Sequence, residues 1–181
     1  DWNEGTVSFW FKPFWKETDP ESIPVFTANG KNFRFYFVKG KKGYMELSVC
    51  PPGQLQILCK NVLKQNEWAH VAFSWSTKTG EAALYVNGRP AGKKTDLSRV
   101  KKLERQSPSI WLGNSGGDRF KAQVGNGLYD EIRIFDRVLP ADEIFALSTS
   151  GSDSAMSALN PDIIPFSGGS SEFVISGGTA R

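Results

Sequence analysis

The sequence predicts an all-β protein, in which two antiparallel sheets pack face to face and one short helix lies near residues 140–147. Apolar residues recur at every second position in short runs, which is the pattern of half-buried antiparallel strands. Gly, Pro, Asn or Asp separates these runs, and such residues favour turns. A chain of 181 residues is long enough to bury the two-layer core of one domain.

Each predicted strand follows from its own run of alternating residues. The first run shows the pattern most clearly, because Val7, Phe9 and Phe11 fall on one face of an extended chain. Asn29-Gly30 is a signal for a type I′ turn, and it joins the second run to the third. The predicted strands are residues 6–12, 23–28, 32–38, 43–50, 54–60, 68–76, 82–87, 109–113 and 127–135.

The single predicted helix follows from its end signals. Pro140 stands where the first helical residue often lies, and the acidic Asp142 and Glu143 favour the positive N-terminal end. Apolar residues continue to Leu147, and Gly151 then stands beyond the expected end. A short helix of two turns is therefore predicted after the last strand.

Charge and hydropathy exclude two classes of partner. Lys and Arg total 22 against 19 Asp and Glu, and a net charge of +3 is too small to indicate nucleic acid or an anionic membrane. No apolar run approaches the roughly 20 residues of a membrane-spanning helix. One polar stretch is locally basic, and it is either a polyanion contact or a solvated loop. Its basic residues are Lys93, Lys94, Arg99, Lys101, Lys102 and Arg105.

The two cysteines flank a predicted hairpin. Cys50 ends one arm, residues 51–54 form the turn, and Cys59 lies near the end of the other arm. If the two cysteines are opposite one another at about 4.5 Å between Cα atoms, they can form a disulfide. A Cys50–Cys59 disulfide would indicate an oxidising, extracellular compartment. The alternative is a pair of reduced thiols packed as small apolar residues. A zinc site is not expected, because the chain has only one His.

Several segments, in order, resemble the laminin-G-like jelly rolls of the concanavalin A-like lectin and glucanase superfamily. The resemblance covers roughly residues 5–147 and implies a jelly-roll sandwich over residues 1–150. The motifs that carry it are Gly5-Thr-Val-Ser-Phe-Trp-Phe-Lys-Pro13, Glu67-Trp-Ala-His-Val-Ala-Phe-Ser-Trp75, Ala83-Leu-Tyr-Val-Asn-Gly88, Ile110-Trp-Leu-Gly113 and the run from Gly127 to Ile144.

The chain departs from the family pattern at one strand. Family members place a further strand before the segment at 6–12, whereas its pattern stands here at residues 166–176. We therefore expect a sandwich at 1–150, a linker at 151–165 and a strand within 166–181 that completes a sandwich. Without that strand the sandwich would have an open edge. The residues expected to make this contact are Phe166, Phe173, Val174 and Ile175.

The strand has two possible destinations. It can fold back onto its own domain, or it can enter a neighbouring copy as a donated strand. We favour donation, because Pro161 and Pro165 stiffen the linker and a swapped strand makes the same contacts. Head-to-tail donation would propagate as a fibre unless its geometry closes a ring. The sequence thus predicts a structural or adhesive extracellular subunit.

Catalysis is not predicted. The superfamily's glucanases carry carboxylates two residues apart on one strand, so that acid and nucleophile share a cleft. The comparable face here reads Glu131, Arg133 and Phe135, which lacks the carboxylate pair. His70 lies among apolar residues of a strand and is expected to be a buried, hydrogen-bonded structural residue.

Two kinds of ligand follow from the resemblance. Related domains often hold a structural Ca²⁺ with a carboxylate at the position of Asp130, although Asp130 can equally orient its own loop. Related domains also include sugar-binding modules, so the alternative function is a monomeric carbohydrate-binding module closed by its own tail. Trp2, Phe14 and Trp15 are its candidate ligand platform, although Trp2 and Phe14 can instead cover the seat of the tail.

Overall fold

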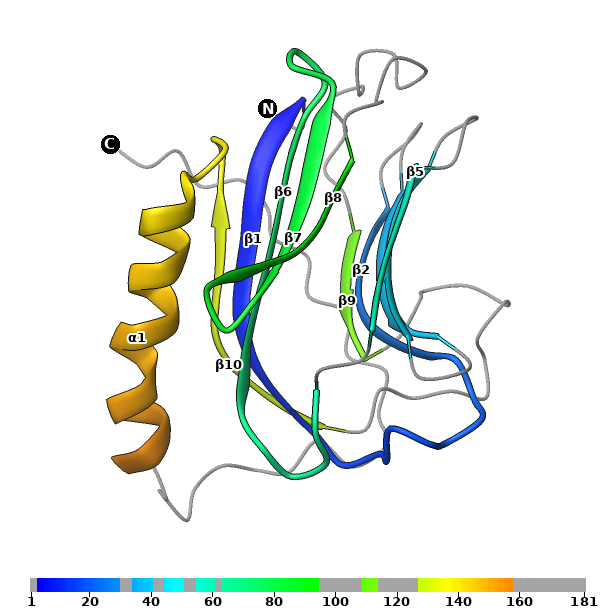
Figure 1. The fold of residues 1–181 in the computed structure, drawn as a ribbon, viewed down its shortest axis with the longest axis vertical. Helices are drawn as coiled ribbons and strands as arrows, with labels where there is room; N and C mark the ends of the chain where they lie inside the picture. Colours follow the sequence, from blue (N-terminus) through cyan, green and yellow to red (C-terminus); the bar gives the residue numbers. More distant parts are fainter. Residues whose placement is uncertain are drawn as a thin grey trace.

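The computed structural model describes residues 3–29, 34–40, 44–50, 55–60, 63–94, 109–113 and 127–157. Within these ranges the chain forms two five-stranded antiparallel sheets and one helix (Figure 1). Sheet A has the strand order β10-β1-β6-β7-β8, and sheet B has the order β5-β4-β3-β2-β9. The predicted two-sheet sandwich with a single helix is therefore confirmed.

All nine predicted strands are present, with ends that differ by at most two residues, and the structure adds a tenth strand that the sequence did not predict. Sheet A contains β10 (Gly127–Phe135), β1 (Glu4–Pro13), β6 (Ala69–Ser76), β7 (Glu81–Val86) and β8 (Arg89–Lys94). Sheet B contains β5 (Leu55–Lys60), β4 (Tyr44–Cys50), β3 (Arg34–Lys39), β2 (Ile23–Asn29) and β9 (Ser109–Leu112). The added strand is β8, which includes Lys93 and Lys94 of the predicted polar stretch.

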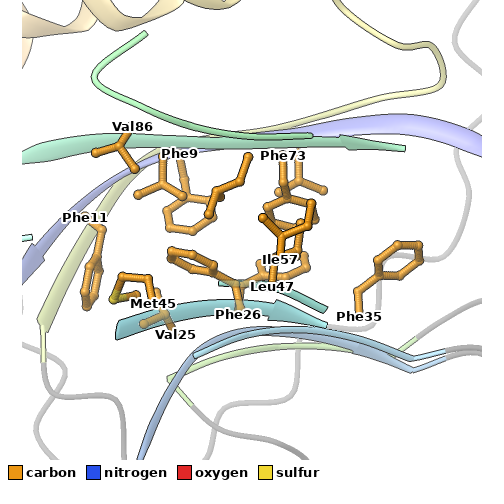
Figure 2. Packing of buried hydrophobic residues seen from close by; sticks show 14 of the residues in the cluster. Phe9, Phe11, Val25, Phe26, Phe35, Met45, Leu47, Ile57, Phe73 and Val86 are labelled. Carbon is orange, nitrogen blue, oxygen red and sulfur yellow. The ribbon is translucent and has the colours of Figure 1, made fainter. Parts of the chain in front are cut away.

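The core lies between the two sheets and is built on phenylalanines. Phe9 of β1 stacks on Phe26 of β2 with ring centroids 6.0 Å apart, and Phe26 meets the edge of Phe73 of β6 at 5.4 Å (Figure 2). These contacts cross from one sheet to the other, and all three rings are at most 1% exposed. Aromatic pairs in such geometries add to the stabilisation from apolar burial. The alternation predicted for the first strand thus generates the packing of the two layers.

One side of the sandwich is closed by a close approach of β8 to β5. A Cβ atom on Gly92 of β8 would lie 2.5 Å from Cγ2 of Ile57 in β5. No side chain larger than hydrogen therefore fits at Gly92 while Ile57 keeps its position. The two sheets meet along this edge, and their opposite edges, β9 and β10, lie on the other side of the sandwich.

The helix α1 (Ala141–Ser157) covers the outer face of sheet A (Figure 1). Ile144 of α1 is fully buried in a small cluster with Ala72 of β6 and Leu139 of the connecting segment. The predicted end of the helix near residue 147 is wrong, because α1 continues through Gly151 to Ser157. Residues 151–157, which were assigned to a linker, are therefore helical. The remainder of the predicted linker and the predicted strand at 166–176 lie outside the described residues.

The predicted Cys50–Cys59 disulfide is wrong. The β4–β5 register pairs Val49 with Leu55 and Met45 with Cys59, so Cys59 lies opposite the start of β4. Cys50 is five positions further along that strand, which is on the order of 16 Å of extended chain. Cys59 is a free, buried thiol, and burial raises its pKa. The cysteines therefore give no support to an oxidising compartment.

The close approach at Gly92 predicts a coupled pair of substitutions. Gly92→Ala should lower the free energy of unfolding by about 1 to 3 kcal/mol, because the added methyl group overlaps Ile57. Ile57→Ala should also destabilise the protein, but the double variant should lose clearly less than the sum, since the smaller side chain makes room. Urea unfolding of the four proteins measures this. Strict additivity would contradict the contact.

Candidate functional site

The inner face of β10 is uncovered at Ile132 and Ile134. Ile134 pairs with Val7, which is 0% exposed in the core, so the two side chains point to the same side of sheet A. Ile134 is nevertheless 40% exposed, and Ile132 is 41% exposed. Both isoleucines therefore face the space between the sheets, at a place where the described part of sheet B does not cover them.

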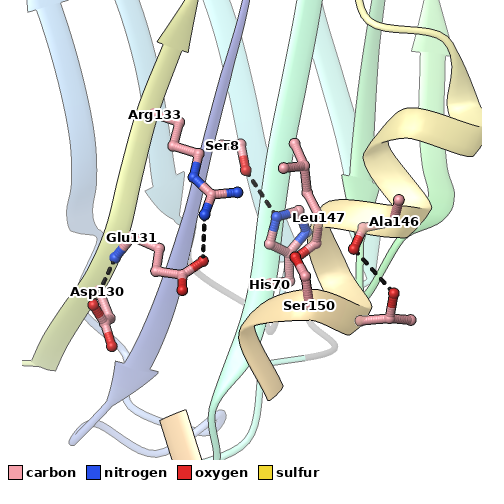
Figure 3. Close-up of polar contacts among 9 residues, drawn as sticks. Ser8, His70, Asp130, Glu131, Arg133, Ala146, Leu147 and Ser150 are labelled. Carbon is pink, nitrogen blue, oxygen red and sulfur yellow. Dashed lines mark hydrogen bonds and ion pairs between the residues drawn. The ribbon is translucent and has the colours of Figure 1, made fainter. Parts of the chain in front are cut away.

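A β-bulge distorts β10 next to these residues. Ser8 pairs with Arg133 and Trp10 pairs with Asp130, so Glu131 and Ile132 together lie opposite Phe9. Glu131 has a φ of 49°, and its N–H donates to Oδ1 of Asp130 at 2.7 Å (Figure 3). The Arg133 guanidinium is 3.0 Å from the Glu131 carboxylate on the outer face. The strand edge at the bulge is thus charged and internally hydrogen-bonded.

The facing edge of sheet B is β9. Ile110 of β9 is buried in the core opposite Ala28, and Leu112 packs against the same core. Trp111 lies between them on the outer face, opposite Thr27. Within the described residues β9 pairs only with β2. We call the gap between the two edges the open seam, and its apolar walls are Ile110, Leu112, Ile132 and Ile134.

One end of the open seam is tied shut by Tyr129 of β10. Its phenol donates to the backbone carbonyl of Val25 in β2 at 2.8 Å, and the same carbonyl accepts the N–H of Gly113 at 3.0 Å. The Tyr129 ring also contacts Phe11, with centroids 4.8 Å apart. Burial raises the pKa of Tyr129, so the phenol stays protonated and can donate. The seam therefore opens only beyond Tyr129, at the two isoleucines.

His70 lies on the other face of sheet A. It is 1% exposed, and its Nε2 is 2.8 Å from the hydroxyl of Ser8. Its ring meets the Trp10 ring edge to face at 5.5 Å, and Leu147 of α1 packs on the same side of β6 (Figure 3). The expected buried, hydrogen-bonded histidine is confirmed. Ser8 is also 1% exposed, so this Ser–His pair has no surface at which a substrate could bind.

The His70 ring is held neutral. Burial, and to a smaller extent the nearby positive charge of Arg133, lower the pKa of His70 from 6.5 to about 4. The buried Nδ1 has no hydrogen-bond partner among the described residues, so a proton there would be left without an acceptor. The imidazole is therefore a structural group whose protonation opposes folding.

The predicted ligand platform is not formed as expected. Trp15 is only 4% exposed and belongs to the core, so its assignment to an exposed platform is wrong. The sequence also missed the buried Lys39, whose Nζ lies 5.7 Å from the Trp15 ring centroid and donates to the carbonyls of Asp19 and Glu21. Burial lowers the pKa of Lys39. Phe14 is half-buried, and its carbonyl accepts a hydrogen bond from Gln65.

The remaining predicted site residues are placed as follows. Asp130 uses its carboxylate locally, on the amide of Glu131, and the described part of the chain has no group of three or more His, Cys, Asp or Glu that could hold a metal ion. Calcium binding therefore stays a prediction. Trp2, Phe166, Phe173, Val174 and Ile175 lie outside the described residues. No helix in the described part of the chain is long and apolar enough to cross a membrane.

Comparison with known proteins decides the family. The laminin-G model described as the concanavalin A-like lectin/glucanases superfamily matches residues 2–145. The chain belongs to this superfamily. Among curated members it is 28% identical over 153 residues to C-reactive protein 1.4 of Limulus polyphemus, and 26% identical over 149 residues to the serum amyloid P-component of Mus musculus. It spans 62% and 61% of the length of these two relatives.

Solved structures show the same superfamily fold. A native heptameric SAP-like pentraxin from Limulus polyphemus matches with a TM-score of 0.63 and 18% identity, over 81% of this chain and 70% of that one. Domain 4 of the extracellular arabinanase AbnA from Geobacillus stearothermophilus, in complex with arabinotriose, matches with a TM-score of 0.62 and 24% identity, over 81% of this chain and 66% of that one. The binding domain of botulinum neurotoxin serotype D matches with a TM-score of 0.66 and 15% identity, over 82% of this chain and 36% of that one.

The environment of His70 predicts a pH dependence. Because the folded pKa lies below the unfolded value, the unfolded state binds the proton first, and stability should fall as pH drops from about 6.5 to about 4. The loss attributable to His70 should approach about 3 kcal/mol. His70→Gln should flatten this part of the profile while leaving the carboxylate titrations. Chemical unfolding at several pH values tests it, and equal slopes for both proteins would contradict it.

Proposed function

We propose that this chain is a non-catalytic, extracellular adhesive domain that assembles by strand exchange. In this proposal the segment 166–176 of one copy fills the open seam of a neighbouring copy. The observation that carries the proposal is the exposure of Ile132 and Ile134 on the core side of β10. An apolar pair facing the interior of a sandwich, beside an edge strand, is a seat for one further strand.

The segment 166–176 has the chemistry that this seat requires. Phe173, Val174 and Ile175 form a short apolar run with high strand propensity, which Glu172 precedes and Ser176 follows. Covering the exposed parts of Ile132 and Ile134 would contribute about 1 kcal/mol for each side chain. New hydrogen bonds to the backbone of an edge strand would add to that.

The length of α1 places its C-terminal end at a distance from the seat that the following chain can still span. The helix runs back alongside β10 (Figure 1), and its 17 residues span about 25 Å. Ser157 is therefore far from Ile134, which lies near the end of β10. Residues 158–165 cover at most about 28 Å when fully extended. Residues 158–172, which precede Phe173, cover about 50 Å when extended, so the seat is within reach of both the same copy and a neighbour, and donation is favoured by Pro161 and Pro165, which stiffen the linker.

The relatives support the binding and assembly class. The SAP-like pentraxin of Limulus polyphemus is heptameric, and the botulinum domain is a receptor-binding domain. The name of the mouse relative, serum amyloid P-component, supports an extracellular location. The second candidate function is a monomeric carbohydrate-binding module closed by its own tail. The arabinotriose complex of AbnA domain 4 favours it.

The assembly is tested at the seat itself. Ile132→Lys with Ile134→Lys should give a monomer, because two charges would face the incoming apolar strand, and the exposed positions should tolerate the change in fold. Leu58→Lys is the matched control, since Leu58 is 58% exposed on β5 at the opposite side of the sandwich. Light scattering after size exclusion, with electron microscopy, should show higher-order species for the wild type and the control only.

Deletion of residues 161–181 tests the donor. The truncated chain should be monomeric, and an added synthetic peptide of residues 166–176 should raise its melting temperature, whereas a scrambled peptide should not. A full-length protein that stays monomeric at all concentrations would contradict the assembly. Binding of that monomer to arabinan oligosaccharides on a glycan array would then support the carbohydrate-binding alternative.

A further inference from the structure

We infer that the incoming strand joins sheet B at β9, not sheet A at β10, with Phe173 and Ile175 facing inward and Val174 facing outward beside Trp111. This inference rests on the strand exchange proposed above and specifies its geometry. The occupant is a second copy of this chain. Three features of the open seam lead to this assignment: the state of each edge, the layer that each edge belongs to, and the spacing of the apolar walls.

The edge of β10 is unsuited to a further strand. The bulge at Glu131 interrupts its regular spacing, and the left-handed φ of 49° turns the backbone out of the extended conformation. The N–H of Glu131 already donates to Asp130. Asp130, Glu131 and Arg133 also put three charged side chains within four residues, and charge and bulges are two of the devices that protect edge strands from pairing.

The edge of β9 has none of these features. Its four residues, Ser109–Leu112, pair with β2 in one continuous register without a bulge. The strand carries no charged side chain. Within the described residues the opposite edge of β9 has no partner strand, so a further strand can continue the ladder there. Of the two edges of the open seam, β9 is the one that offers regular backbone hydrogen bonding.

A strand added to β9 would also cover the exposed isoleucines. Sheets A and B meet at β8 and β5, and β10 and β9 are the last strands on the opposite side of each sheet. One more strand beyond β9 would extend sheet B across the inner face of β10. A strand added to β10 would instead extend sheet A and leave Ile132 and Ile134 facing the same gap. Only the β9 assignment completes the core.

The spacing of the walls sets the direction of each incoming side chain. Ile110 and Leu112 are two residues apart on β9, and Ile132 and Ile134 are two residues apart on β10. Two apolar residues two apart on the incoming strand would match both walls. Phe173 and Ile175 have that spacing, so Val174 must point to the outer face of sheet B. Trp111 is its neighbour on that face.

Cross-linking distinguishes the two edges. In a Cys50→Ser background, Val174→Cys combined with Trp111→Cys should give disulfide-linked multimers on a non-reducing gel, because the incoming Val174 lies beside residue 111 on the outer face of sheet B. The matched control is Val174→Cys combined with Arg133→Cys, which places the second thiol on the outer face of β10. Light scattering of both proteins under reducing conditions measures assembly independently of the cross-link.

The outcomes separate this inference from the proposed function. Linked multimers through residue 111 and none through residue 133 would support the β9 assignment. Multimers linked through residue 133 alone would overturn it and leave strand exchange intact. The absence of multimers in light scattering would overturn strand exchange itself, together with this inference.

Charge substitutions test the direction of the side chains. Phe173→Asp and Ile175→Asp should each weaken assembly at least about tenfold, because each would place a carboxylate between the sheets. Val174→Asp should change it less than about threefold, since that side chain would meet solvent beside Trp111. Concentration-dependent light scattering gives these ratios. A larger effect at Val174 than at Phe173 and Ile175 would reverse the assignment.

Discussion

Every sheet in this protein must have its apolar inner face covered, and the fold is organised by how that requirement is met. The aromatic cluster of Phe9, Phe26 and Phe73 covers both inner faces at the centre, where side chains of the two sheets interdigitate. At one side the close approach of Gly92 to Ile57 brings the two sheets together and covers the inner faces. At the other side the Tyr129–Val25 hydrogen bond holds only one end of the edges together. Ile132 and Ile134 lie where the requirement is not met, which is why the site is found at an edge and not in a pocket.

Two buried titratable side chains show how differently this fold treats charge. Lys39 keeps two backbone carbonyls and an aromatic face around its Nζ, so its charge is partly compensated although burial lowers its pKa. The His70 ring has the Ser8 hydroxyl as its hydrogen-bond partner, and the positive charge of Arg133 would repel a protonated imidazole. Lys39 therefore fastens the segment between β1 and β2, whereas His70 is tolerated under α1 only as a neutral ring. Neither arrangement resembles a catalytic site.

Alternation predicted nine strands because the two-residue period is a direct consequence of one buried face, as in Val7, Phe9 and Phe11. The strand β8 escaped prediction because it is an edge strand whose contact with β5 depends on an absent side chain at Gly92. The register of Cys50 and Cys59 also escaped, since it is fixed by the pairing of Val49 with Leu55 and not by symmetry of the sequence. Helix α1 passes through Gly151 against its propensity.

The candidate site was predictable only in outline. The missing strand in the order of the motifs predicted an open edge. Which edge is open depends on the order of the strands in each sheet, and local sequence patterns do not predict that order. Trp15 was misplaced for a similar reason, because it joins the core and meets Lys39, a residue far from it in the sequence, only through the tertiary fold. Long-range contacts decide both cases.

The location of donor and seat has a consequence for symmetry. The open seam lies between β9 and β10, whereas the donor segment follows α1, which covers the outer face of sheet A. Two different surfaces would therefore meet in each contact, so the contact is head to tail and each copy has one donor and one seat. Such a contact continues indefinitely or closes as a ring, of which a reciprocal pair of copies is the smallest form. With at most about 28 Å of chain between Ser157 and Phe166, the linker length sets the rotation between neighbours and thereby selects among these forms.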